Sequence, residues 1–267
     1  MERDKIFRGI KKIVIKIGTN VLTSSNNRLD LSIIEHLVEQ ICYLIKNKKV
    51  KVIIVTSGAI GAGMQILGWR KRPKEISKLQ AAASVGQSRL MRIYDRLFRE
   101  EGINVGQILL TRDVFTVPVR KNNARETIQN LLKLNAVPII NENDSVAVDE
   151  IKVGDNDILS AYVADLISAD MLMIITDVDG LSSFDPKEKS NSKVIDLITN
   201  ISMAEKLVKN SNPSGYGTGG MKSKVTAAKY VTEKGIYCII LNGKKLWSIK
   251  KAFKGEKIGT FFIARRN

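Results

Sequence analysis

Short apolar runs, rich in β-branched residues, alternate with longer amphipathic segments along most of this chain. The continuous apolar runs are typical of strands buried on both faces, and they predict strands at 13–17, 52–55, 105–110, 137–140, 171–175 and 236–241. Segments with helical periodicity separate them and predict helices over 31–46, 75–101, 124–134, 157–168 and 221–233. Strands that alternate with helices predict an α/β fold, a three-layer αβα sandwich with a mainly parallel central sheet.

Shorter features complete this predicted layout. Residues 146–153 alternate between apolar and polar, which predicts a small hairpin before the next helix, and residues 259–263 predict a short C-terminal strand. Pro118, Pro186 and Pro213 are expected in connections. The 267 residues show no internal repeat and no low-complexity linker, so we expect a single domain over 1–267.

Composition favours a globular protein of the cytoplasm. Hydrophobic residues make up 44% of the chain and charged residues 26%, which is enough to expect a sizeable core. No apolar run reaches the roughly 18 residues that a membrane span needs, and no apolar signal core follows the N-terminus. Cys42 and Cys238 lie in apolar segments without metal-binding or redox spacing. We therefore expect two buried free thiols in a reducing compartment.

The net charge of +16 favours anionic partners, either nucleic acid or a small phosphorylated ligand. Lysine and arginine are spread over the whole length, and no basic stripe is interleaved with aromatic residues, as a surface for stacking bases would require. This distribution favours a generally solubilising role for lysine over nucleic-acid binding.

Polar and glycine-rich segments follow five of the predicted strands. They occupy 18–20, 56–63, 141–144, 176–180 and 242–243. Each alone is compatible with an ordinary turn, because turns also use Gly, Asn, Asp and Ser. In an open α/β sheet, however, the carboxyl ends of parallel strands meet at one edge, where ligands bind. Together these segments predict the rim of an active site.

Two basic features point to an anion at this rim. Lys16 lies inside the apolar strand 13–17, where its charge costs free energy unless it meets an anion or reaches water from the strand end. The turn Gly217-Thr218-Gly219-Gly220 opens the helix that carries Met221, Lys222, Ser223 and Lys224. Glycine-freed backbone N–H groups at a helix N-terminus bind anions. Two lysines that converge on one anion predict phosphoryl transfer.

The other polar residues of the rim suggest a substrate that carries an ammonium group. Asp144 would supply the opposite charge, and Asn141 and Asn156 would fix orientation. Ser57 adds a hydroxyl near a helix start, where Gly58, Gly61 and Gly63 would let backbone approach a ligand closely. Helix capping is the structural alternative for the carboxylates of Asp155 and Asp157.

Several common site types lack support in this sequence. The glycines match neither the dinucleotide-binding fingerprint nor the P-loop motif. His36 is the only histidine and is expected on the surface, so histidine-based metal sites and Ser–His–Asp or Cys–His catalysis are not favoured, and we expect no protein-ligated metal.

The chain resembles the amino acid kinase family, and within it the members that phosphorylate L-glutamate. The resemblance covers nearly the whole chain and is carried by residues 14–20, 55–63, 80–87, 140–144, 154–157 and 217–221. It implies the amino acid kinase fold and transfer of the γ-phosphoryl group of ATP, with Mg²⁺, to the γ-carboxylate of L-glutamate. The product would be L-glutamyl 5-phosphate, in the first step of proline biosynthesis. Many such proteins carry a further C-terminal PUA domain, which is not expected within these 267 residues.

The resemblance also implies roles for individual residues. Ser57, Asn141, Asp144 and Asn156 would bind glutamate, while Lys16 and Lys224 would stabilise the transferring phosphoryl group and Asp157 would orient them. The nucleotide site would comprise Lys16, Thr176, Asp177, Thr218, Gly219, Gly220, Met221, Lys222, Ser223 and Lys224. The family further implies a homodimer or homotetramer and possible feedback inhibition by proline.

Alternatives remain open at this point. Acetylglutamate, aspartate, carbamate and uridylate kinases share the sheet and the phosphate site. A regulatory or RNA-binding protein on a kinase-like scaffold would account for the basic charge, and would be retained on RNA with a steep dependence on salt.

Overall fold

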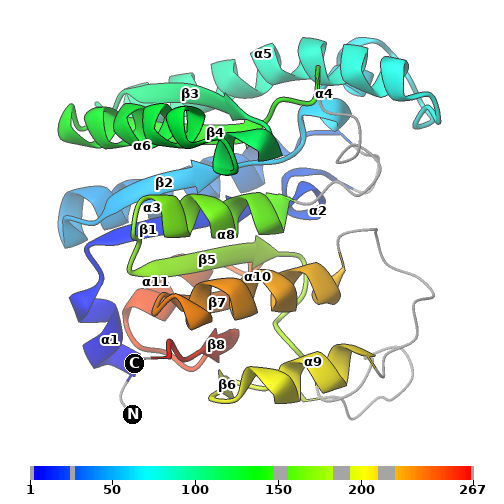
Figure 1. Cartoon of the computed structure of the whole chain (residues 1–267). Coiled ribbons are helices and arrows are strands. Elements are labelled where there is room, and N and C mark those ends of the chain that lie inside the picture. Colours follow the sequence, from blue (N-terminus) through cyan, green and yellow to red (C-terminus); the bar gives the residue numbers. More distant parts are fainter. Residues whose placement is uncertain (1–2, 25–27, 147–155, 183–192, 210–219, 266–267) are drawn as a thin grey trace.

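The computed structural model describes residues 3–24, 28–146, 156–182, 193–209 and 220–265 (Figure 1). Its strands are β1 (Lys12–Ile17), β2 (Lys51–Val55), β3 (Val105–Leu110), β4 (Val137–Glu142), β5 (Met171–Thr176), β6 (Leu197–Ile198), β7 (Tyr237–Asn242) and β8 (Thr260–Phe262). Its helices are α1 (Arg3–Gly9), α2 (Thr19–Leu22), α3 (Leu31–Lys48), α4 (Ala59–Ile66), α5 (Ile76–Glu100), the 3₁₀-helix η1 (Arg112–Phe115), α6 (Pro118–Lys133), α8 (Asn156–Leu166), α9 (Ile201–Lys209), α10 (Met221–Glu233) and α11 (Ser248–Phe253).

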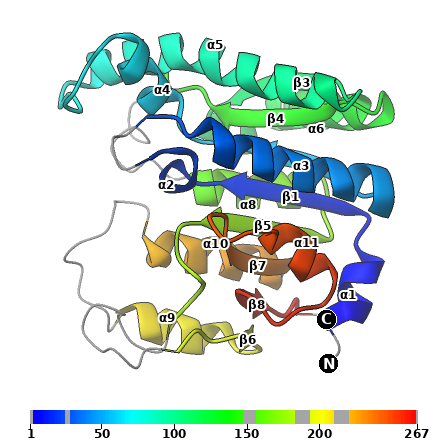
Figure 2. The ribbon, with the colours of Figure 1, turned by 180° about the vertical axis from the view of Figure 1, so that it is seen from behind.

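The strands form one eight-stranded sheet in the order β3-β4-β2-β1-β5-β7-β8-β6. Every neighbouring pair is parallel except β7 and β8, which are antiparallel. Helices cover both faces of the sheet, as the two opposite views show (Figures 1 and 2). The predicted α/β class, with a mainly parallel sheet between two helical layers, is confirmed.

The alternation of side chains along β1 sends its residues into two separate cores. Ile13, Ile15 and Ile17 pack in the core that α3, α5 and α11 cover, while Val14 packs in the core beneath α8 and α10. Because alternate residues of a strand share a face, Lys16 lies on the same face as Val14. Its side chain therefore projects toward α8 and α10.

Helices α4 and α5 pack backbone against backbone. A Cβ added to Gly63 would lie 1.7 Å from the carbonyl oxygen of Ala82, and one added to Gly86 would lie 1.8 Å from that of Ala59. We expected Gly63 to give room to a ligand, and this expectation is wrong: its close approach is to α5. Gly58 begins α4 with a φ of +98°, a conformation that side chains other than glycine rarely adopt.

Other local predictions are corrected by packing. The helix expected from 124 begins at Pro118, because proline fits the first turn of a helix, where its missing N–H is not needed. His36 is half-buried rather than on the surface: its Nε2 accepts a hydrogen bond from the backbone N–H of Trp247 at 3.1 Å. The predicted hairpin beyond Val146, and both Pro186 and Pro213, lie outside the described residues.

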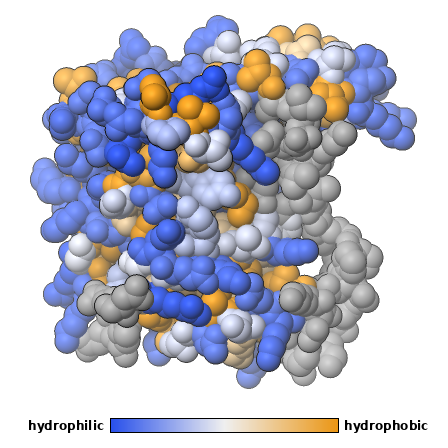
Figure 3. All heavy atoms as spheres, viewed as in Figure 1, coloured by the Kyte–Doolittle hydropathy of each residue, from blue (hydrophilic) through white to orange (hydrophobic). Residues whose placement is uncertain are grey.

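The surface and the thiols agree with the expectations from composition. No helix in the described part of the chain is both long and apolar enough to cross a membrane. On the face seen in Figure 3, hydrophilic residues predominate and apolar residues are scattered. Cys42 and Cys238 are buried free thiols, as predicted.

Candidate functional site at the carboxyl edge of the sheet

The five polar segments that follow strands gather at one edge of the sheet. Strands β4, β2, β1, β5 and β7 are consecutive neighbours and all parallel, so their carboxyl ends lie side by side. The backbone joins these ends further, since the N–H of Thr56 donates to the carbonyl of Ile140, and that of Gly243 to the carbonyl of Thr176. The rim predicted from the sequence is therefore one continuous edge of the protein.

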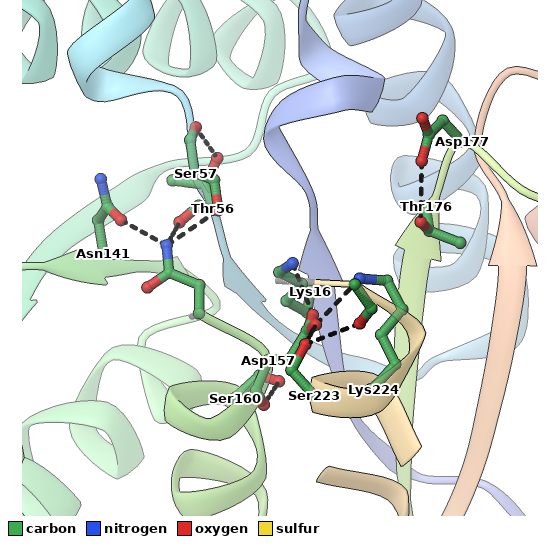
Figure 4. Close-up of polar contacts among 12 residues, drawn as sticks. Lys16, Thr56, Ser57, Asn141, Asp157, Ser160, Thr176, Asp177, Ser223 and Lys224 are labelled. Carbon is green, nitrogen blue, oxygen red and sulfur yellow. Dashed lines mark hydrogen bonds and ion pairs between the residues drawn. The ribbon is translucent and has the colours of Figure 1, made fainter. Parts of the chain in front are cut away.

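Lys16, Asp157 and Lys224 meet at this edge from three different elements (Figure 4). The Nζ of Lys16 lies 2.6 Å from Oδ1 of Asp157, and the Nζ of Lys224 lies 3.0 Å from Oδ2. The hydroxyl of Ser223 donates to the same Oδ2 at 2.7 Å. The two lysines that were predicted to converge do so, with one carboxylate between them.

Burial strengthens the attraction between the carboxylate and the two ammonium groups, because little water screens their charges. Asp157 is fully buried, and Lys16 and Lys224 are 6% and 8% exposed. Burial alone would raise the pKa of Asp157, but the two ammonium groups outweigh it and lower that pKa to about 2. Asp157 also lies in the first turn of α8, where the helix dipole favours a negative charge. The carboxylate is therefore ionised at neutral pH and holds both lysines in place.

Lys16 keeps donors for a further partner. An ammonium group has three N–H bonds, and Asp157 takes one of them. The Nζ lies close to the backbone, because a Cβ added to Gly18 would be 3.4 Å from it. Glycine at position 18 thus places no side chain of its own against the tip of Lys16.

A second polar group lies on the other side of Lys16, around Asn156. The Nδ2 of Asn156 contacts the carbonyl oxygen of Thr56 at 2.6 Å, Oγ of Ser57 at 3.0 Å and Oδ1 of Asn141 at 2.9 Å. Asn141 in turn donates to Oε1 of Gln87 at 2.8 Å. Three of the predicted substrate-binding residues, Ser57, Asn141 and Asn156, are thus brought into direct contact.

A buried hydroxyl pair in the core holds Thr56, which Asn156 contacts. The hydroxyls of Thr56 and Tyr94 lie 3.0 Å apart, and both residues are fully buried. Burial raises the pKa of Tyr94 to about 12, so the phenol is neutral at ordinary pH and pairs with the hydroxyl of Thr56. The carbonyl that Asn156 contacts therefore belongs to a residue held in the buried core.

Gln87 is the member of this group that sequence reasoning missed. It lies on α5 between the buried residues Ala83 and Leu90, and it is itself buried. The signal was available, because a glutamine at a core-facing position of an amphipathic helix is uncommon and needs a polar partner.

Asp144, the predicted partner of a substrate ammonium group, follows β4 and is half-buried. Burial raises the pKa of its carboxyl to about 6, although the nearby charge of Arg72 opposes the rise. A cation bound beside this carboxylate would lower its pKa back toward the ordinary value. The ionised form of Asp144 is therefore stabilised when a positively charged group binds beside it.

The predicted nucleotide-site residues lie on the side of β5 and α10. Thr176 ends β5 and donates to Oδ1 of Asp177 at 3.2 Å, and Asn20 donates to Oδ2 of the same carboxylate at 3.2 Å. Gly220 precedes α10, and Met221, Lys222, Ser223 and Lys224 form its first turn. Thr218 and Gly219 lie outside the described residues.

Metal-binding clusters are not found in the described part of the chain, where no three His, Cys, Asp or Glu side chains are grouped as ligands. Asp157, the most buried carboxylate of the rim, already contacts two lysines. It is therefore poorly suited to bind a metal ion directly.

Comparison with known proteins connects this geometry to a family. The sequence model of the amino acid kinase family matches residues 11–242. Glutamate 5-kinase of Caldanaerobacter subterraneus subsp. tengcongensis is 46% identical over 96% of this chain and 68% of its own length, and that of Clostridium tetani is 43% identical over 98% of both. Among solved structures, carbamate kinase from Giardia lamblia bound to AMP-PNP superposes with a TM-score of 0.68 at 21% identity, covering 97% of this chain and 100% of that one. The chain belongs to the amino acid kinase family.

Proposed function

We propose that this protein is a glutamate 5-kinase, which transfers the γ-phosphoryl group of ATP to the γ-carboxylate of L-glutamate and forms L-glutamyl 5-phosphate. The observation that carries the proposal is the pair of lysines held on one buried carboxylate at the carboxyl edge of the sheet, next to the amides of Asn141 and Asn156. Relatives named glutamate 5-kinase, at 41–46% identity over nearly the whole chain, support the choice of glutamate.

The reaction needs no general base. A glutamate side chain has a reference pKa of about 4.3, so at neutral pH its carboxylate is already the nucleophile. One carboxylate oxygen attacks the γ-phosphorus, the bond to the β,γ-bridging oxygen breaks, and ADP leaves with the bonding electron pair. A chain whose only histidine lies on α3 and contacts Trp247 is compatible with this chemistry.

Charge compensation is what the protein must supply, because an anionic carboxylate approaches an anionic phosphate. Lys16 and Lys224 would donate to the oxygens of the migrating phosphoryl group, where negative charge is spread in the transition state. Asp157 would hold both ammonium groups at a fixed separation without reacting itself. Mg²⁺ bound to ATP would supply further charge neutralisation as part of the substrate.

The two substrates would lie on opposite sides of Lys16. Ser57, Asp144 and Asn156 would bind the glutamate, with Asp144 facing its ammonium group. The nucleotide would lie over Thr176 and Asp177, and the N-terminus of α10 would face its phosphates, since free N–H groups there favour anions. Feedback inhibition by proline and assembly as a homodimer or homotetramer remain predictions from the family.

The test is release of ADP by the purified protein with and without L-glutamate, with hydroxylamine present to trap the acyl phosphate as a hydroxamate. We expect ADP release and hydroxamate only with L-glutamate. Carbamate, UMP, aspartate and acetylglutamate serve as competing substrates in parallel reactions. Equal or faster turnover with any of these, or salt-sensitive retention on RNA without glutamate-dependent ADP release, would refute the proposal.

A further inference from the structure

Three side-chain amides form a hydrogen-bonded row at the rim, and backbone groups beside Asn141 and Asn156 fix how the amides are oriented. Gln87 on α5 contacts Asn141 on β4, which contacts Asn156 at the start of α8. The backbone N–H of Glu142 can only donate, so the Asn141 atom 2.9 Å from it is the oxygen. The nitrogen of Asn141 must then face Gln87, and the Gln87 atom that it contacts is Oε1. The amide nitrogen of Gln87 consequently points elsewhere.

The orientation of the Asn156 amide is fixed in the same way. The carbonyl of Thr56 can only accept, so the Asn156 atom 2.6 Å from it is the nitrogen. The oxygen of Asn156 therefore points away from Thr56 and Ser57, which its nitrogen contacts.

Each end of this row of three amides therefore leaves one polar atom without a partner among the described residues. The Nε2 of Gln87 and the Oδ1 of Asn156 are buried and have no hydrogen-bond partner within the described residues. The two side chains belong to residues that are 9% and 7% exposed. Buried polar groups without partners are rare in folded proteins, so both atoms need an explanation.

Gln40 shows how this protein treats a glutamine that is purely structural. It is fully buried on α3, and its Nε2 donates to the carbonyl of His36 at 3.3 Å. Its Oε1 accepts from the backbone N–H groups of Ile249 and Lys250 at 2.9 and 3.3 Å. Both ends of that amide are satisfied by the protein, whereas the nitrogen of Gln87 is not.

We propose that Gln87 Nε2 donates a hydrogen bond to the α-carboxylate of the bound L-glutamate, an inference that rests on the proposed function. An α-amino acid presents a carboxylate that only accepts and an ammonium group that only donates. The spare donor of Gln87 matches the first, and the spare acceptor of Asn156, together with Asp144, matches the second. Gln87 is thus a substrate-binding residue that selects for the α-carboxylate.

The first test is the variant Gln87→Glu. It keeps an oxygen for Asn141 and replaces the donor with an oxygen that repels a carboxylate. We expect the KM for L-glutamate to rise between about ten- and a hundredfold, as loss of a hydrogen bond to a charged group implies. The kcat and the KM for ATP should stay within about twofold of wild type. An unchanged KM for L-glutamate would overturn the proposal.

The pH profile of this variant separates ligand binding from a structural effect. The carboxyl group introduced by Gln87→Glu can donate as the amide does when it is protonated, whereas its ionised form cannot. The ratio of variant to wild-type KM for L-glutamate should therefore fall as pH is lowered from 8 to 6. A ratio that does not change with pH would contradict direct donation to the substrate.

Substrate analogues identify the group that Gln87 recognises. γ-Aminobutyrate is glutamate without its α-carboxylate, and its inhibition constant against L-glutamate should be the same in wild type and Gln87→Glu. A rise parallel to the KM for L-glutamate would mean that Gln87 only shapes the pocket. If γ-aminobutyrate inhibits neither protein, the pH profile decides.

Control variants guard against misfolding and keep the two proposals distinct. Gln40→Glu makes the same replacement at the satisfied glutamine, and we expect a lower Tm with an unchanged KM for L-glutamate. Gln87→Met removes the donor without adding charge and serves if Gln87→Glu does not fold. The ratio of its KM for L-glutamate to that of wild type should be raised by a factor that does not change with pH. A wild type without glutamate-dependent ADP release would refute the proposed function, whereas an active wild type and a normal Gln87→Glu would refute only the role of Gln87.

Discussion

At the residue scale, a lysine is tolerated inside a buried strand because its charge is matched by a carboxylate of the protein. Lys16 is nearly fully buried in β1, yet its ammonium group lies 2.6 Å from Asp157, and a second lysine lies on the same carboxylate. Breaking such a buried arrangement by removing one partner costs far more than an exposed ion pair is worth. The same arrangement positions two cations before any phosphate arrives.

We therefore predict that Lys16→Ala and Lys224→Ala each lower kcat by roughly 10²–10³, the usual cost of one preorganised donor to a transition state. Lys12→Ala is the matched control, because Lys12 lies on the same strand and face but at the opposite end, where it contacts the carbonyl of Ile167. Its kcat should stay near that of wild type. ADP release by the folded variants measures both effects, and a normal kcat in either rim variant would contradict the assigned role.

Asp144 should make glutamate binding sensitive to mild acid. Its folded-state pKa is raised from 3.8 to about 6 by burial, and only the ionised form attracts an ammonium group. The KM for L-glutamate should accordingly rise as pH falls through about 6, while the KM for ATP changes little. The raised pKa also means that the stability contributed by the protonated carboxyl is lost as pH rises through about 6.

Asp144→Asn provides the comparison. We expect this variant to bind glutamate weakly and with no dependence on pH around 6, because an amide does not titrate there. Initial rates at a series of pH values measure the effect. A variant that retains the pH dependence of wild type would assign the titration to another group.

At the scale of elements, periodicity located most of the structure. The six strands and five helices that the alternating pattern predicted are all present, with ends shifted by a few residues, as in α6. The short C-terminal strand predicted over 259–263 is β8, whereas the predicted hairpin beyond Val146 lies outside the described residues. The helices that the periodicity missed include α1, α4, α9 and α11, which are too short to show a clear period. The contact of α4 with α5 depends on two glycines that meet in space, and no local pattern reveals that.

The α4–α5 contact predicts a strong effect of Gly86→Ala. The added methyl group would lie 1.8 Å from the carbonyl oxygen of Ala59, and two helix backbones would have to separate. Overpacking of this kind costs about 1–3 kcal/mol or more, so the Tm should fall by several degrees. Gly9→Ala is the control, because a Cβ there meets nothing within 4 Å, and its Tm should match wild type. Equal Tm values for the two variants would mean that α4 and α5 are not in backbone contact.

At the scale of the whole molecule, the parallel sheet is what makes the site. Five neighbouring strands run the same way, so the polar residues that follow them are collected at a single edge. The net charge of +16 is compatible with anionic substrates, and the buried lysine pair places positive charge where phosphoryl transfer needs it.

The sequence by itself determined the sheet, its helical layers, the polar rim and the two lysines, because side-chain periodicity and strand-end chemistry are local properties. The family resemblance implied that Asp157 orients the lysines, but only the tertiary structure decided that each lysine contacts a different oxygen of that carboxylate. It also decided that Asn156 turns its nitrogen to the carbonyl of Thr56, 100 residues earlier, and that Gln87 is left with a spare donor. Those contacts join residues from different helices and strands. They depend on how the layers pack, which no short segment of the chain encodes.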